Sequence, residues 1–330
     1  MTSQLTLTTP DLWSQRVDQL GLRLEASPVG PLIQKLYEEL AQKGIDLRPP
    51  CFVANEWGCP DGQPLIGIPF WLVDPRMHGF EEEHADDVED GPAILMGLRH
   101  EAGHAVNYAW RLWTDPEWTQ LFGDFAKEYG DDYRPCPFSQ HHVRHLPGWY
   151  AQKHPDEDFA ETFAVWLTPG LDWRARYVGT SALAKLEYVD RIMTQVGKTP
   201  PLVPPGDPDP EELDFTVGEF YADRHEEDAP PTAELANRLD HDLRQLFPAE
   251  GLGIDAAQLV WDRRKALMRH VSDYTGSRMY VAKVLIRFVF VRLRELNLRA
   301  APGRELDSMI GVSSMLTALT SNFLERGSFL

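Results

Sequence analysis

The chain has 330 residues, of which 43% are hydrophobic and 11% aromatic, so it is long and apolar enough to bury a large core. Its 51 acidic residues outnumber its 32 basic ones, and the net charge of −19 argues against binding to nucleic acids or to anionic membranes. The first residues lack the basic and apolar stretches of a secretory signal, and every apolar run is too short to span a bilayer, so a cytoplasmic location is expected.

The first part of the chain predicts two helices followed by two strands. Apolar spacing favours helices over 10–24 and 31–42, and the runs 51–53 and 65–73 are typical of strands. Pro69 cannot donate a ladder hydrogen bond, so the second strand is expected at a sheet edge. Such an edge could pair with an extended peptide, or it could simply be covered by a loop.

The motif His-Glu-Ala-Gly-His follows an acidic run at 80–90, which is expected to be a solvated loop. Asp90 can cap a helix, a proline two residues later fits its first turn, and the apolar spacing after them predicts a helix over about 92–113. In such a helix His100 and His104 lie on one face, where both imidazoles can reach a single zinc ion.

Glu101 lies between the two histidines, where its carboxylate can accept a proton from a water on the open side of the metal. A metzincin would have a glycine and a third histidine further along this helix, but Asn107 and Trp110 occupy those positions. That subclass is therefore excluded, and a third ligand must come from elsewhere. Until it is found, a helix that carries two histidines without binding metal is the competing interpretation.

The stretch between this helix and the next is rich in tyrosine, tryptophan and histidine, and its prolines argue against a long helix. It is expected to form a lid or pocket, and one of its side chains is expected to stabilise the oxyanion of a hydrolytic reaction. The candidates are Tyr133, His142, His145 and Tyr150. His145 also lies four residues after His141, but this second pair lacks an intervening glutamate.

A second helix is predicted over about 156–168, with Asp156 as its cap and an apolar packing side. Glu157 and Glu161 are four residues apart, so both carboxylates face the same way. One can ligate zinc while the other accepts the outer N–H of a ligating histidine. An acidic first turn that merely complements the helix dipole is the alternative, although it does not account for Glu161.

The motif His-Glu-Ala-Gly-His followed by Pro-Asp-Glu-Asp-Phe-Ala-Glu-Thr-Phe-Ala resembles the gluzincin metallopeptidases, in particular the bacterial putative zinc-binding metallopeptidase family. It is more distantly similar to the anthrax lethal factor and Mlc titration factor type. The resemblance covers roughly 50–195 and implies that Glu157 is the third ligand, with Glu161 as its neighbour just outside the ligand set. It also implies a zincin-like catalytic domain.

The expected fold class is α+β: a mainly helical zincin-like domain with a small N-terminal sheet over 1–198, then a proline-rich linker at 199–213 and a helical C-terminal lobe over 214–330. The lobe could close over a cleft or bind a protein partner. Further helices are expected at 182–193 and near 232–247, 255–271, 276–296 and 304–324.

Together these residues predict a metallopeptidase that uses Zn²⁺ to hydrolyse a peptide or protein substrate, with Glu101 as the general base. Tyr150 and His145 are the expected additional catalytic residues. Two other hypotheses remain open from the sequence: a zinc-containing binding or regulatory protein that acts through its C-terminal helices, and a helical scaffold without metal.

Overall fold

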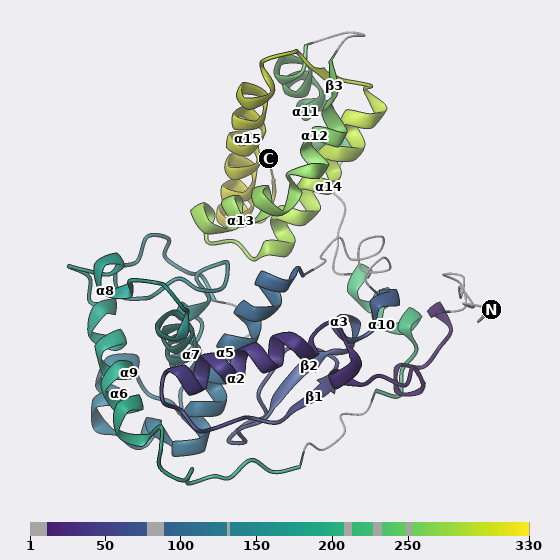
Figure 1. The fold of residues 1–330 in the computed structure, drawn as a ribbon. Helices are drawn as coiled ribbons and strands as arrows, with labels where there is room; N and C mark the ends of the chain where they lie inside the picture. The colour runs from purple at the N-terminus through teal and green to yellow at the C-terminus, as the bar shows by residue number, and fades with distance from the viewer. Residues whose placement is uncertain are drawn as a thin grey trace. The chain divides into compact units, whose positions relative to one another are not determined.

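A computed structural model describes residues 12–77, 89–130, 133–207, 213–226, 233–248 and 253–329. The described chain is mostly helical and contains two small two-stranded sheets, one of them near the N-terminus (Figure 1). The predicted α+β class is therefore confirmed. None of the described helices combines the length and apolarity that a membrane span requires. Most of the acidic run 80–90 and part of the predicted linker lie outside the described residues.

Contacts divide the chain into two compact units, each of which is described separately here. The first unit consists of Met1–Asp131, Gln140–Leu146 and Tyr150–Glu227. The second consists of Asp132–Ser139, Pro147–Trp149 and Asp228–Leu330. The functional division at 198 and 214 stays a prediction.

The helix predicted over 10–24 is wrong for most of its length. The described part of this range is irregular and contains one short 3₁₀ turn, η1 (Val17–Gln19), and a second turn, η2 (Leu24–Ala26), begins at its last residue. Arg16 has an extended backbone and forms an antiparallel bridge with Thr216, so tertiary pairing overrides the local helical spacing.

The predicted helix over 31–42 is confirmed as α2 (Gly30–Gln42). Its buried face joins the main core of the first unit through apolar residues such as Leu36. A buried ion pair also ties α2 to the following long helix, because the Arg99 guanidinium donates to both Glu39 carboxylate oxygens at 2.7 Å. Both ends of this pair are satisfied, as a buried charge requires.

Strands β1 (Cys51–Ala54) and β2 (Ile66–Pro69) pair in parallel. The strand predicted over 65–73 is therefore too long, because Phe70–Val73 forms the short helix α3. Pro69 lacks the N–H that the ladder needs, so the strand ends at this residue and the chain turns into helix.

The outer edge of β2 is covered at Gly67. Its N–H donates to the Gly58 carbonyl at 2.7 Å, and the two glycines form an antiparallel bridge. A Cβ at Gly67 would lie 3.0 Å from the Ala54 Cβ and 3.2 Å from the Gly58 oxygen, so this close packing favours glycine. At Gly67 this edge is therefore covered by the loop that contains Gly58, and pairing of the edge with a peptide stays a prediction.

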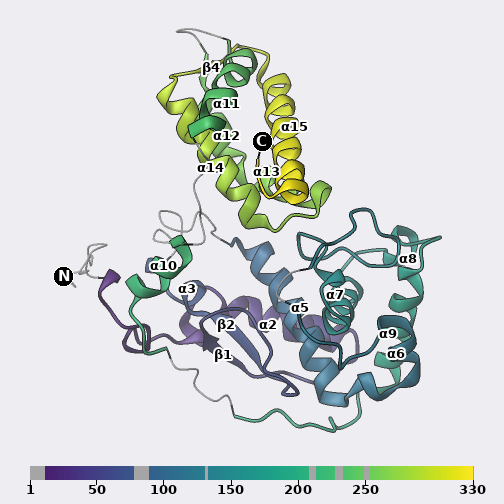
Figure 2. The ribbon, with the colours of Figure 1, turned by 180° about the vertical axis from the view of Figure 1, so that it is seen from behind.

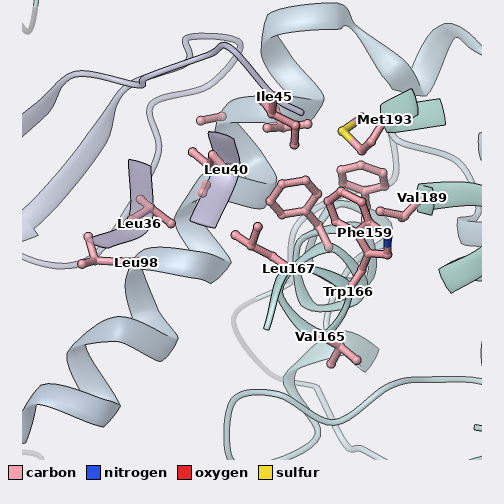
Figure 3. Close-up of a cluster of buried hydrophobic side chains, with 14 of the residues drawn as sticks. Leu36, Leu40, Ile45, Leu98, Phe159, Val165, Trp166, Leu167, Val189 and Met193 are labelled. Atoms are coloured by element: carbon pink, nitrogen blue, oxygen red, sulfur yellow. The ribbon is translucent and has the colours of Figure 1, made fainter. Parts of the chain in front are cut away.

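Four helices surround the core of the first unit: α2, α5 (Gly91–Trp110), α7 (Pro155–Leu167) and α9 (Ala182–Val196). Figure 3 shows side chains of all four meeting in one apolar cluster. In Figure 2, α7 lies on one side of α5 and the β1–β2 sheet on the other. The remaining elements are η3 (Leu112–Thr114), α6 (Pro116–Phe122), η4 (Tyr150–Gln152), α8 (Trp173–Arg176) and α10 (Val217–Glu226).

The second unit is a helical bundle with its own apolar core. The expected single helix over 255–271 is instead two helices, because Arg263 leaves the helical conformation between them with φ of −104°. The elements are α11 (Ala233–Leu246), β3 (Ile254–Asp255), α12 (Ala256–Asp262), α13 (Arg264–Thr275), α14 (Met279–Glu295), β4 (Arg299–Ala300) and α15 (Glu305–Arg326).

Two short segments from the aromatic stretch also belong to the second unit. The Trp149 indole N–H donates to the Asp273 carbonyl at 2.9 Å, and the Tyr133 hydroxyl donates to the Gly148 carbonyl at 3.1 Å. Gly148 has a φ of +79°, a conformation that glycine adopts without strain.

Candidate metal centre

Helix α5 carries the predicted histidine pair through the middle of the first unit. The Asp90 carboxylate caps it by accepting the Ala93 N–H at 3.0 Å, and the left-handed conformation of Arg111 ends it. Leu98, Ala102 and other apolar side chains bury the helix against the core. Because the helix is buried on nearly all sides, its two histidines and Glu101 lie away from bulk water.

Gly103 allows α5 and α7 to approach each other closely. A Cβ at this position would lie 2.7 Å from the Ala160 Cα and 2.9 Å from the Ala160 oxygen, which is closer than van der Waals contact. The absence of a side chain thus brings the first turn of α7 next to the histidines of α5.

The predicted ligands His100, His104 and Glu157 come together in one buried group. Glu157 Oε2 lies 2.9 Å from His100 Nε2 and 3.2 Å from His104 Nε2, and the two Nε2 atoms are 3.2 Å apart. A tetrahedral zinc ion with bonds of about 2.0–2.1 Å separates its ligand atoms by about 3.3 Å. The donor types and their spacing therefore fit zinc.

Glu161 contacts the ring nitrogen of His100 that does not face Glu157. His100 Nδ1 lies 2.9 Å from Glu161 Oε1, so a histidine that binds metal through Nε2 donates its outer N–H to this carboxylate. The other oxygen of Glu161 accepts the backbone N–H groups of His145 and Leu146 at 3.1 and 2.9 Å. The two α7 glutamates thus contact different nitrogens of His100, and their division into ligand and orienting residue stays a prediction.

Asp156 supports His104 in the same way, a role that the sequence interpretation missed. His104 Nδ1 lies 2.9 Å from Asp156 Oδ2, and the Asn107 amide and the Tyr108 hydroxyl each donate to Asp156 at 2.7 Å. Asp156 is also not the helix cap, since His154 Nδ1 accepts the Asp156 N–H at 3.1 Å. The sequence did contain an indication of this role, because Asn107 and Tyr108 lie one helical turn after His104 and therefore on the same face.

The electrostatics of the metal-free group reflect its burial and its ion pairs. Burial lowers the pKa of His100, but hydrogen bonds with Glu157 and Glu161 outweigh it and raise this pKa to about 10. Burial raises the pKa of Glu157, but the charge of His104 and the histidine hydrogen bonds hold it well below its usual value. Glu157 is therefore an ionised carboxylate, the form that a metal ligand requires.

Glu101 differs from Glu157 because the pKa of its carboxyl is raised, with burial as the largest cause. The charges of the two histidines act in the opposite direction. A glutamate that takes up protons more readily than usual suits a general base that must also release the proton to a leaving group.

Two tyrosines border the ligand group. The Tyr129 hydroxyl donates to Glu157 Oε1, the oxygen that does not face the histidines, and its ring stacks on His154 at 4.2 Å. The Tyr150 ring centre lies 5.4 Å from that of His100. Tyr150 was expected near the site, whereas Tyr129 was not, because the irregular stretch around it carries no periodicity that orients a side chain.

The side chains of the other residues proposed from this stretch contact groups outside the ligand set. His145 Nε2 is bonded to the Met96 carbonyl at 3.0 Å, and His142 Nε2 lies 3.8 Å from Asp158 Oδ2. Burial lowers the pKa of His145, which favours its neutral form. Tyr133 belongs to the second unit and donates to the backbone there.

A second buried cluster holds the chain next to the metal group. The Lys185 ammonium donates to Asp158 Oδ2 at 2.5 Å and to the His141 carbonyl at 2.7 Å. Burial raises the pKa of Asp158 to about 7, although the charge of Lys185 lowers it. The bond from Lys185 to the His141 carbonyl holds the start of the segment 141–146. At the end of this segment, the backbone N–H groups of His145 and Leu146 donate to Glu161.

Two histidines one turn apart on a buried helix, with a glutamate from a second helix, are the ligand pattern of a zincin-type zinc site. Residues 82–189 match a family model described as "Putative zinc-binding metallo-peptidase". The matched segment is thus similar to zinc-binding metallopeptidases, which supports the predicted family resemblance in its coarser form. No curated protein and no solved structure matches the chain. The more distant similarity to anthrax lethal factor and Mlc titration factor stays a prediction.

Proposed function

We propose that the first unit is a zinc-dependent peptidase. The observation that carries this proposal is the buried group of His100, His104 and Glu157, with Glu101 on the same helix as the histidines. These residues would hold the ion through the two Nε2 atoms and Glu157 Oε2, and Glu161 and Asp156 would orient the imidazoles. Bound zinc would polarise the scissile carbonyl and lower the pKa of the attacking water.

Glu101 is the general base in this mechanism. Its carboxylate takes the proton from the attacking water and then transfers it to the leaving amine. The raised pKa of this buried carboxyl favours the first transfer, because a more basic glutamate takes up the proton of the water more readily. The substrate that we propose is a peptide, because the matched family is described as a metallo-peptidase.

Tyr150 is our candidate for the donor that stabilises the oxyanion, and Tyr129 joins it on geometric grounds. Both rings border the ligand group: the Tyr150 ring centre lies 5.4 Å from that of His100, and the Tyr129 hydroxyl donates to Glu157 Oε1. His145 is given a supporting role instead, because its imidazole is engaged by the Met96 carbonyl and its backbone N–H by Glu161.

The direct test of the base is Glu101→Gln, measured with a mixed peptide library and mass spectrometry of the products. We expect the variant to keep about one zinc per chain and to lose cleavage by at least about 100-fold, the usual scale for general-base removal. Lys43→Gln, at the position directly after α2, is the control for the effect of expressing and purifying a variant. Cleavage at the wild-type rate by Glu101→Gln would remove this residue from the role of base.

A second candidate function is a zinc-containing binding protein that acts through its C-terminal helices. The observation in its favour is on α15, where Leu306 and Ile310 are one turn apart and are 71% and 57% exposed. This function predicts stoichiometric zinc without hydrolysis of any peptide in the library. The peptidase proposal predicts hydrolysis that requires the metal.

A further inference from the structure

Lys153 lies at the junction between η4 and α7. Its N–H donates to the Tyr150 carbonyl at 3.0 Å, and the next residue, His154, caps α7. The backbone of Lys153 is therefore held on both sides, only four residues before Glu157. Its side chain is half-buried.

The Lys153 ammonium sits between the two tyrosines that border the metal group. Nζ lies 5.0 Å from the Tyr129 ring centre, 5.3 Å from the Tyr150 ring centre and 3.4 Å from the Tyr150 hydroxyl. Tyr129 in turn donates to Glu157, and the Tyr150 ring lies beside His100. Aromatic faces attract the cation and limit its movement, so a positive charge is held at the edge of the ligand group.

The half-buried Lys153 differs in its pairing from the buried cations Lys185 and Arg99 of this unit. Lys185 is bonded to Asp158 and Arg99 to Glu39, so both are neutralised by carboxylates. No carboxylate among the described residues forms an ion pair with Lys153, although the chain contains 51 acidic residues. The ammonium is thus available to an anionic group from outside the chain.

We propose that Lys153 binds a carboxylate of the substrate, so that the protein prefers peptides with a negative charge next to the bond that is cleaved. This inference rests on the proposed peptidase function. A half-buried ammonium held by two rings gives a stronger ion pair than a fully solvated lysine, because less water competes for the carboxylate. The carboxylate could be the C-terminus of the peptide or an aspartate or glutamate side chain.

The test compares kcat/KM for matched peptides that differ only in one charge. One pair ends in a free carboxylate or an amide, and a second pair has glutamate or glutamine beside the scissile bond. For at least one pair we expect the wild type to favour the charged peptide about tenfold. The pair that shows the preference identifies the source of the carboxylate.

Variants of Lys153 connect the preference to this side chain. Lys153→Gln should bring the ratio close to one, Lys153→Glu should invert it, and Lys153→Arg should retain it. Lys43→Gln is the matched control, since Lys43 lies 4.3 Å from the Trp166 ring centre. Trp166 is nine residues beyond Glu157 on α7, about 14 Å along the helix. A wild-type ratio in Lys153→Gln would overturn the proposal.

A binding measurement separates this inference from the peptidase proposal. Two dipeptide hydroxamates that differ only in a terminal carboxylate or amide are titrated into the zinc-loaded protein by calorimetry. We expect tighter binding of the carboxylate form by about tenfold, lost in Lys153→Gln, whether or not peptides are cleaved. Equal Kd values in the wild type would overturn the role of Lys153 at the C-terminus, even if peptide hydrolysis is observed.

Discussion

The two histidines of the metal centre are supported by different parts of the molecule. His104 donates to Asp156, which is held by Asn107 and Tyr108 from the same helix as His104. His100 donates to Glu161, which is held by backbone N–H groups of an irregular segment. One support is therefore local to two helices, and the other depends on how a loop is packed.

This difference predicts that removing Asp156 and removing Glu161 affect the segment at His145 and Leu146 differently. Glu161→Ala and Asp156→Ala should each weaken zinc binding by about 10- to 100-fold, because each removes the acceptor that orients one ligand. Only Glu161→Ala should also speed hydrogen exchange at the amides of His145 and Leu146, since these donate to Glu161. The measurements are zinc competition with a chelator and exchange followed by mass spectrometry.

Glu161→Gln provides the control for this pair of variants, because it keeps the size of the side chain and one acceptor oxygen. We expect its loop amides to exchange more slowly than those of Glu161→Ala. Equal protection of the loop in Asp156→Ala and Glu161→Ala would mean that the two supports are not separate.

The stability of the metal-free protein should depend on pH through His100. The pKa of His100 is raised from 6.5 to about 10, so the folded chain keeps a proton that the unfolded chain has lost between these values. The stability from this proton is complete below pH 6.5 and is lost as the pH rises through about 10. The slope is at most about 1.4 kcal/mol per pH unit for one group.

Urea unfolding at pH 6, 8 and 10 measures this slope in metal-free wild type and in His100→Gln. We expect a shallower loss of stability in the variant, and a shallower loss in zinc-loaded wild type, because a ligating imidazole is neutral at all three values. If the unfolding free energy fell equally steeply with pH in the metal-free wild type and in His100→Gln, the extra proton of the folded chain would not be bound by His100.

The sequence predicted the local features of the site better than the features that depend on tertiary packing. Spacing alone placed the two histidines and Glu157 on helices that the structure confirms, because a helix fixes the direction of residues four apart. It missed Tyr129, whose position depends on an irregular segment. It also gave Asp156 a capping role, since a capping residue and a carboxylate that orients a histidine have the same residue type.

The fold was predictable to a similar extent and for the same reason. The α+β class and α2 follow from periodicity, but the helix predicted over 10–24 does not form because Arg16 pairs with Thr216, a partner far along the chain. The membership of 147–149 in the second unit likewise depends on a contact between Trp149 and Asp273. Contacts at such separations leave no pattern in the local sequence.

The central claim is that His100, His104 and Glu157 form one zinc site. Its most direct test is elemental analysis of purified wild type beside His104→Ala and Glu157→Ala, with circular dichroism to confirm that each variant is folded. The account predicts about one zinc per wild-type chain and loss of zinc from both folded variants. A wild type that takes up no zinc even after supplementation, or a folded Glu157→Ala that keeps a full equivalent, would contradict it.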